Sequence, residues 1–146
     1  MRKIGQRAAR TVMFVGLVSS VATAAIAGDL ATKAQKLPAL EIGLGDAGFG
    51  MSQKDYSLEA GKAYKLNVKG TGKQSCTLRG AEFFASIYVR QIAAGEVEIL
   101  NPTFAGFDLD DPSEFELYFV PIRTGKFTIG CTGLEAKGMK VDITVK

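Results

Sequence analysis

Apolar and polar residues alternate along much of this 146-residue chain, and the alternation is clearest from residue 114 onward. Between residues 114 and 120 every second side chain is a large apolar one, which predicts a strand with one buried face. Pro121 ends this strand because it has no N–H to donate to a neighbouring strand, and Gly125 supplies a turn. Two further alternating runs follow. The residues predicted to lie in the core are Phe115, Leu117, Phe119, Phe127, Ile129, Val141 and Ile143.

Shorter extended runs occupy the first part of the chain, at residues 40–44, 64–68, 75–78, 87–92 and 96–100. Glycine-containing turns separate several of them at intervals of about 8–12 residues, which is typical of a β-sandwich. Residues 81–86 lack the alternation and predict one helical turn. We expect Phe83 and Phe84 to plug the end of the sandwich, the alternative being a platform for a ligand. The pattern therefore predicts an all-β fold, an antiparallel two-sheet sandwich with at most one or two short helical turns.

Two sulfur side chains fall at neighbouring strand ends. Cys131 is the last residue of the run that contains Phe127 and Ile129, so we expect it to face the interior. Met139 shares its parity with Val141 of the final strand. The short loop between them should therefore place Cys131 and Met139 side by side, facing the same way.

This arrangement, with a strand, a proline, a glycine turn, a strand ending in Cys131, a short loop and Met139, resembles the copper-binding loop of the cupredoxins. The runs CTLRGAEFFASIYVRQI and ELYFVP are similar to a bacterial periplasmic branch of that family, and the resemblance extends over residues 39–146. It implies a cupredoxin-like Greek-key sandwich. The family binds copper through two histidines, a cysteine and a methionine, but this chain contains no histidine. Gly133 or Leu134 stands where the loop histidine of the family would fall, and Cys76 stands near the position of the family's upstream histidine.

In the cupredoxin-like arrangement Cys76 and Cys131 meet at one end of the sandwich, and two uses remain open. In the first use they form a disulfide, comparable with the intersheet bridge of immunoglobulin-like domains. Such a bridge should stabilise the fold by about 4 kcal/mol. Alternatively Cys76, Cys131 and Met139 bind Cu(I), because thiolate and thioether ligands favour that ion. The first use predicts a metal-free module that binds an envelope or periplasmic protein partner near residues 43–50 and 133–138. The second predicts a copper-handling protein.

Residues 1–27 have the pattern of a cleaved secretory signal peptide. Four basic residues precede an apolar stretch at residues 11–21, and residues 25–27 read as a small-x-small cleavage site. The apolar stretch is shorter than the roughly 20 residues of a membrane span, although an uncleaved anchor is the alternative. We therefore expect a signal peptide at 1–27, an N-terminal tether at 28–38 and a cupredoxin-like domain at 39–146, located in the periplasm.

Charge and residue types exclude two classes of function. Four of the 18 Lys and Arg residues lie in the signal peptide, which leaves 14 against 15 Asp and Glu. No basic stripe with interleaved aromatic residues is present, so we expect no nucleic-acid partner. We also expect no enzyme, because the chain has no histidine to act as a general base and no C-x-x-C motif.

Two further segments have the composition of ligand-binding sites. The acidic segment 108–114, with Asp108, Asp110, Asp111 and Glu114, offers several carboxylates to calcium but lacks EF-hand spacing. An exposed acidic hairpin tip is the simpler interpretation, and both remain open. The glycine-rich segment 43–50 lacks the Lys-Ser/Thr ending of a phosphate-binding loop, so we expect a flexible turn or a bulge there.

Overall fold

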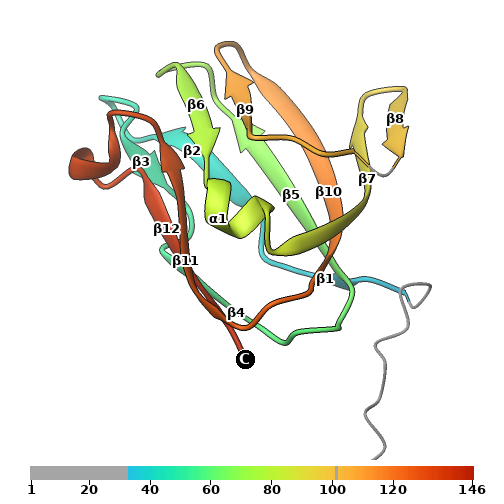
Figure 1. Cartoon of the computed structure of the whole chain (residues 1–146). Helices are drawn as coiled ribbons and strands as arrows, with labels where there is room; N and C mark the ends of the chain where they lie inside the picture. Colours follow the sequence, from blue (N-terminus) through green and yellow to red (C-terminus); the bar gives the residue numbers. More distant parts are fainter. Residues whose placement is uncertain (1–32, 101) are drawn as a thin grey trace, which may run out of the picture.

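Two β-sheets pack face to face in the computed structural model, which describes residues 33–100 and 102–146 (Figure 1). The predicted signal peptide at 1–27, the tether as far as residue 32, and Asn101 lie outside the described residues. The all-β sandwich predicted from the alternation is confirmed. No helix in the described part of the chain is long and apolar enough to cross a membrane.

The larger sheet has seven strands. Six of them follow the order β3-β2-β5-β10-β7-β8, and the seventh, β1, also pairs with β5. Residues 35–37 belong to the predicted tether, yet β1 pairs with β5 and Leu37 is buried. The strands of this sheet are β1 (Gln35–Lys36), β2 (Leu40–Leu44), β3 (Gly50–Met51), β5 (Tyr64–Gly70), β7 (Ile87–Ala94), β8 (Val97–Leu100) and β10 (Ser113–Pro121).

The smaller sheet has five strands, with the order β4-β12-β11-β6-β9. They are β4 (Asp55–Leu58), β6 (Cys76–Arg79), β9 (Gly106–Leu109), β11 (Gly125–Cys131) and β12 (Lys140–Val145). Two short helical elements complete the described chain, the single turn α1 (Ala81–Phe84) and the 3-10 turn η1 (Glu135–Lys137), in agreement with the predicted one or two.

Both sheets are mixed, whereas the sequence predicted purely antiparallel pairing. β1 and β2 run parallel to β5, and β4 runs parallel to β12. The chain passes between the sheets repeatedly, from β5 to β6, back to β7, and from β9 to β10 and β11. Many neighbouring strands therefore come from distant parts of the sequence, such as β5 and β10 or β4 and β12. Alternation within one strand cannot reveal the direction of such a neighbour, because it depends only on which side chains are buried.

The predicted core is confirmed, since all seven residues named from the alternation are buried. One strand departs from strict alternation at a predicted bulge. Gly43 has φ +89°, and a Cβ there would lie 2.3 Å from the Thr71 Oγ1 atom, so a side chain is excluded. The register between β2 and β3 shifts at this point, and Leu44 is only half-buried.

The helical turn α1 follows β6 and leads into β7, so it connects the two sheets along the chain (Figure 1). Its aromatic rings also contact both sheets. The Phe83 ring centroid lies 5.8 Å from that of Phe119 on β10 and 6.0 Å from that of Phe127 on β11. Phe84 contacts Phe104 and Phe107, with centroids 4.7 and 5.9 Å away. Both α1 rings are buried. The predicted plug is therefore a buried contact between the sheets rather than an exposed platform for a ligand.

Candidate functional site

The end of β11 and the start of β12 place Cys131 beside Met139. The Cys131 N–H donates to the Met139 carbonyl at 3.0 Å, which extends the ladder between the two strands. The loop between them is closed by the Leu134 N–H, which donates to the Cys131 carbonyl at 2.9 Å. Gly138, with φ 90°, then turns the chain into β12. Cys131 and Met139 are both fully buried, so the predicted adjacency of these two residues is confirmed.

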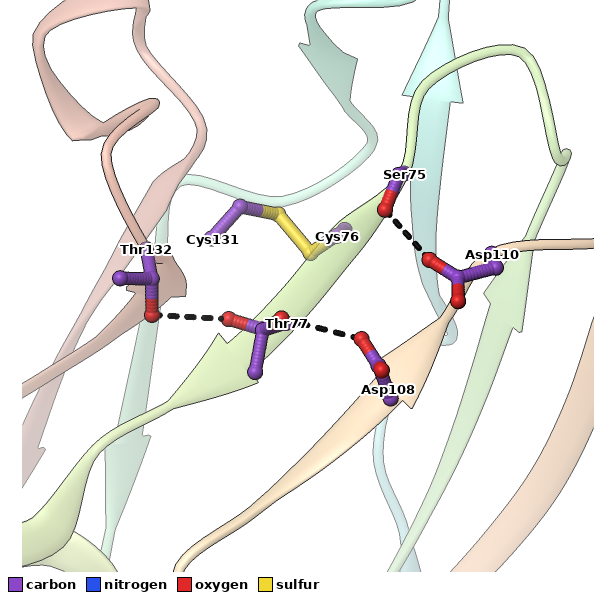
Figure 2. The surroundings of a disulfide bond; sticks show 7 residues. All are labelled: Ser75, Cys76, Thr77, Asp108, Asp110, Cys131 and Thr132. Carbon is purple, nitrogen blue, oxygen red and sulfur yellow. Dashed lines mark hydrogen bonds between the residues drawn. A yellow bond between two sulfur atoms is a disulfide. The ribbon is translucent and has the colours of Figure 1, made fainter.

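Cys76 and Cys131 form a disulfide, with their Cα atoms 5.0 Å apart (Figure 2). Cys76 begins β6 and Cys131 ends β11, so the antiparallel pairing of these strands brings both to the same end. The accessible fractions of the two residues are 1% and 0%. The bridge joins neighbouring strands of the five-stranded sheet, whereas the comparison with immunoglobulin-like domains suggested a bridge between sheets.

Hydroxyl groups fix the strands around the disulfide, as Figure 2 shows. Thr77 Oγ1 donates to Asp108 Oδ1 at 3.0 Å, and the Ser75 hydroxyl donates to Asp110, which ties β6 and its preceding loop to β9 and the residue after it. On the other side, the Thr132 N–H and Oγ1 both donate to the Thr77 carbonyl, at 3.0 and 3.2 Å. Cys76 and Cys131 are therefore held in place by contacts of their sequence neighbours.

The hydrogen bonds from Ser75 and Thr77 engage two of the carboxylates of the acidic segment 108–114. Two of its carboxylates accept hydroxyl groups of β6 and its preceding loop, and Glu114 accepts the Asn67 amide at 2.7 Å and lies 3.3 Å from Lys69 Nζ. These partners, Asn67 first, hold the pKa of Glu114 below its usual value. Among the described residues, no group of three or more His, Cys, Asp and Glu is placed to hold a metal ion. Three of the four carboxylates therefore serve contacts within the protein.

The loop of residues 132–138, which follows Cys131, contacts the loop of residues 43–50. We call these two loops together the loop end of the sandwich. Lys137 Nζ lies 4.0 Å from the centroid of the Phe49 ring, a cation–π contact that joins the two loops. Lys54 Nζ donates to the Gly138 carbonyl at 3.1 Å, and Lys73 Nζ donates to the Gly45 carbonyl at 3.1 Å. The sequence did not predict these lysine contacts, because no local pattern connects residues so far apart in the chain.

The residues at this end do not fit a blue-copper centre. The chain contains no imidazole, and the two cysteine sulfurs that could act as thiolates are bonded to each other. Gly133 or Leu134 stands where the resemblance places a loop histidine; Gly133 has no side chain, and that of Leu134 packs against the core. The donor set that remains in the oxidised protein is the thioether of Met139. An ordinary copper site of the cupredoxin type is therefore incompatible with the residues present.

No protein-family model and no curated protein matches this sequence. Solved structures do match. A multicopper oxidase from Campylobacter jejuni, a metallo-oxidase, aligns over 79% of this chain and 31% of its own, with TM-score 0.53 and 12% identity. A copper-containing nitrite reductase from Thermus scotoductus covers 76% and 30%, with TM-score 0.54 and 9% identity. A laccase from Pediococcus acidilactici covers 81% and 28%, with TM-score 0.53 and 16% identity.

The chain thus spans less than a third of the length of each of these three proteins. Identities of 9 to 16% establish a shared fold and not a shared activity. The sandwich, its mixed sheets and the short loop between β11 and β12 define the fold. The chain has a cupredoxin-like fold, and a disulfide joins its two cysteines at one end of the sandwich.

Proposed function

We propose that this protein is an exported, non-enzymatic cupredoxin-like module that binds an envelope or periplasmic protein through its loop end. The observation that carries the proposal is the Cys76–Cys131 disulfide. The resemblance to cupredoxins implies that Cys76 and Cys131 lie near the positions of that family's metal ligands. There the bridge would supply by covalent linkage the stability that a metal site would otherwise contribute. Once the metal is replaced, the loops of this end are free to serve recognition.

The geometry of the loop end suits a binding surface. Loops ordered before association lose less conformational entropy when a partner binds, and here lysine contacts fix both loops. Asp46, Ala47, Glu135 and Ala136 remain exposed at the surface of the loop end. A rigid scaffold that presents exposed loops is a common architecture for binding proteins.

Site-specific photo-crosslinking in the periplasm tests this proposal. A photoreactive residue at Ala47 or Ala136 should yield a discrete crosslinked product. The matched control is the same residue at Lys126, which is exposed near the start of β11, at the opposite end of the strand from Cys131. We expect no such product there. Loop-end positions that yield nothing above background, or a Lys126 control that yields the same product, would count against a partner at the loop end.

A second candidate function applies to the reduced protein. The hydrogen bond from Cys131 to the Met139 carbonyl keeps a third sulfur-bearing residue next to the cysteine pair. Two thiolates and a thioether are soft ligands that favour Cu(I), so reduction of the disulfide would leave Cys76, Cys131 and Met139 as a copper-handling set. Because the two sulfurs are bonded to each other, reduction has to precede binding, and copper uptake should depend on the redox state of the protein.

A further inference from the structure

The outermost strand of the seven-stranded sheet exposes a concentration of apolar side chains. All four residues of β8 are exposed, and Val97, Ile99 and Leu100 are 60%, 48% and 67% accessible. β8 pairs with β7 on one side, and no strand of the described chain pairs with its other side. The outward backbone groups of β8 form a sheet edge of the kind to which another strand can be added.

The ladder between β7 and β8 shows which way these side chains point. Ile99 lies opposite Ile92, and Val97 lies opposite Ala94. Opposed residues of a ladder share one face of the sheet, and Ile92 is buried in the core. Val97 and Ile99 therefore project from the core-facing side of the sheet, although each remains about half exposed or more. A strand added at β8 would place apolar side chains against both.

The edge also carries unbalanced negative charge. Natural edge strands are often protected by lysine, proline or a bulge, but β8 contains neither residue and pairs with β7 in an unbroken register. Its one charged residue is Glu98, and Glu96 lies in the turn before it. Neither glutamate forms an ion pair with a described residue, whereas Glu116, two strands further in, lies 2.5 Å from Lys65 Nζ.

We propose that β8 binds an extended segment of another protein, in which apolar residues alternate with Lys or Arg, as an added strand. The apolar residues of that segment meet Val97 and Ile99, and its cations meet Glu96 and Glu98. A second copy of this chain fits the edge less well. Antiparallel pairing of two β8 strands with their faces in phase puts Glu98 opposite or diagonal to the same residue of the other copy, and like charges there are destabilising.

This surface is independent of the loop end, since β8 belongs to the edge of the larger sheet and contributes no residue to segments 43–50 and 132–138. The proposal for β8 and the proposal for the loop end are therefore tested by different experiments. Failure of one proposal leaves the other unaffected.

The test is a titration of the isotope-labelled, exported protein with short synthetic peptides, followed by NMR. A peptide that alternates Lys and Val should shift the backbone amide signals of residues 97–100 in a saturable manner. A peptide that alternates Glu and Val should not. Ile99→Lys should weaken binding of the Lys/Val peptide by about tenfold, because it removes apolar contact and adds repulsion. The charge exchange Glu98→Lys should shift the preference toward the Glu/Val peptide.

The matched control is Ile122→Lys. Ile122 is 58% exposed and follows β10, so it has a similar accessibility outside β8. This variant should bind the Lys/Val peptide like the unaltered protein. The proposal is overturned if the Lys/Val peptide leaves residues 97–100 unshifted at millimolar concentration, if the Glu/Val peptide binds equally well, or if Ile122→Lys weakens binding as much as Ile99→Lys. Sedimentation that shows self-association abolished by Ile99→Lys would identify a second copy as the occupant instead.

Discussion

Reduction of the Cys76–Cys131 disulfide should lower the free energy of unfolding by about 4 kcal/mol. The two cysteines are 55 residues apart, and a bridge across a loop of that length removes much of the conformational entropy of the unfolded chain. The sulfurs are buried at the end of the core, and reduction deletes no heavy atom from it. The loss should therefore come chiefly from the unfolded state.

Urea unfolding, followed by far-UV circular dichroism with and without a reducing agent, measures this loss. For a domain of this size the transition should move to lower urea by about 2–3 M. The control is the double variant Cys76→Ala with Cys131→Ala, whose unfolding should not respond to the reducing agent. If the oxidised and reduced proteins unfold at the same urea concentration, the bridge does not stabilise the fold and our explanation of its role is wrong.

Three further predictions concern the sandwich itself. Phe119→Ala should cost roughly 3–5 kcal/mol in a urea titration, because Phe119 is buried against the Tyr64 and Phe83 rings; a cost near zero would contradict its place in the core. Gly80→Ala should cost about 1–3 kcal/mol, because a Cβ there would lie 2.4 Å from Ile129 Cγ2; unchanged stability would mean that β11 can move aside. The hydrogen bond from the Lys65 ammonium lowers the pKa of Glu116. The stability that this pair gives the folded protein is therefore present above the usual pKa of 4.5 and is lost as the pH falls through the lowered pKa. Glu116→Gln should flatten the acid limb of the stability profile, and an unchanged limb would show that this pair contributes nothing.

Alternation along the chain predicted the strands and the buried faces well, because burial of one face is a local property of each strand. Phe115, Leu117 and Phe119 are buried as expected, and Cys131 and Met139 lie side by side. The departure at Leu44 has a cause visible in the sequence, since Gly43, the first residue of the glycine-rich segment, allows a bulge.

The pairing of strands could not be predicted in the same way. The parallel contact between β4 and β12 joins residues near the two ends of the domain, and nothing in either strand specifies the other. The cation–π contact of Lys137 with Phe49 is equally non-local. The disulfide was one of two alternatives that followed from the resemblance to cupredoxins, because spacing alone does not determine which strands are neighbours. The exposed edge at β8 was missed, since a short apolar run predicts burial.

Competition for Cu(I) between a chelator and the protein, measured before and after anaerobic reduction, decides how the two cysteines are used. The oxidised protein should contain no free thiol when unfolded and should not compete for Cu(I). After reduction, Cu(I) uptake that is lost in Cys131→Ser and weakened in Met139→Ala would support the copper-handling candidate, whereas failure to compete with a weak chelator would eliminate it. In both cases we infer that the cysteines of the native protein are held in the Cys76–Cys131 disulfide and bind no Cu(I). Free thiols or tight Cu(I) binding in the native, unreduced protein would contradict that conclusion.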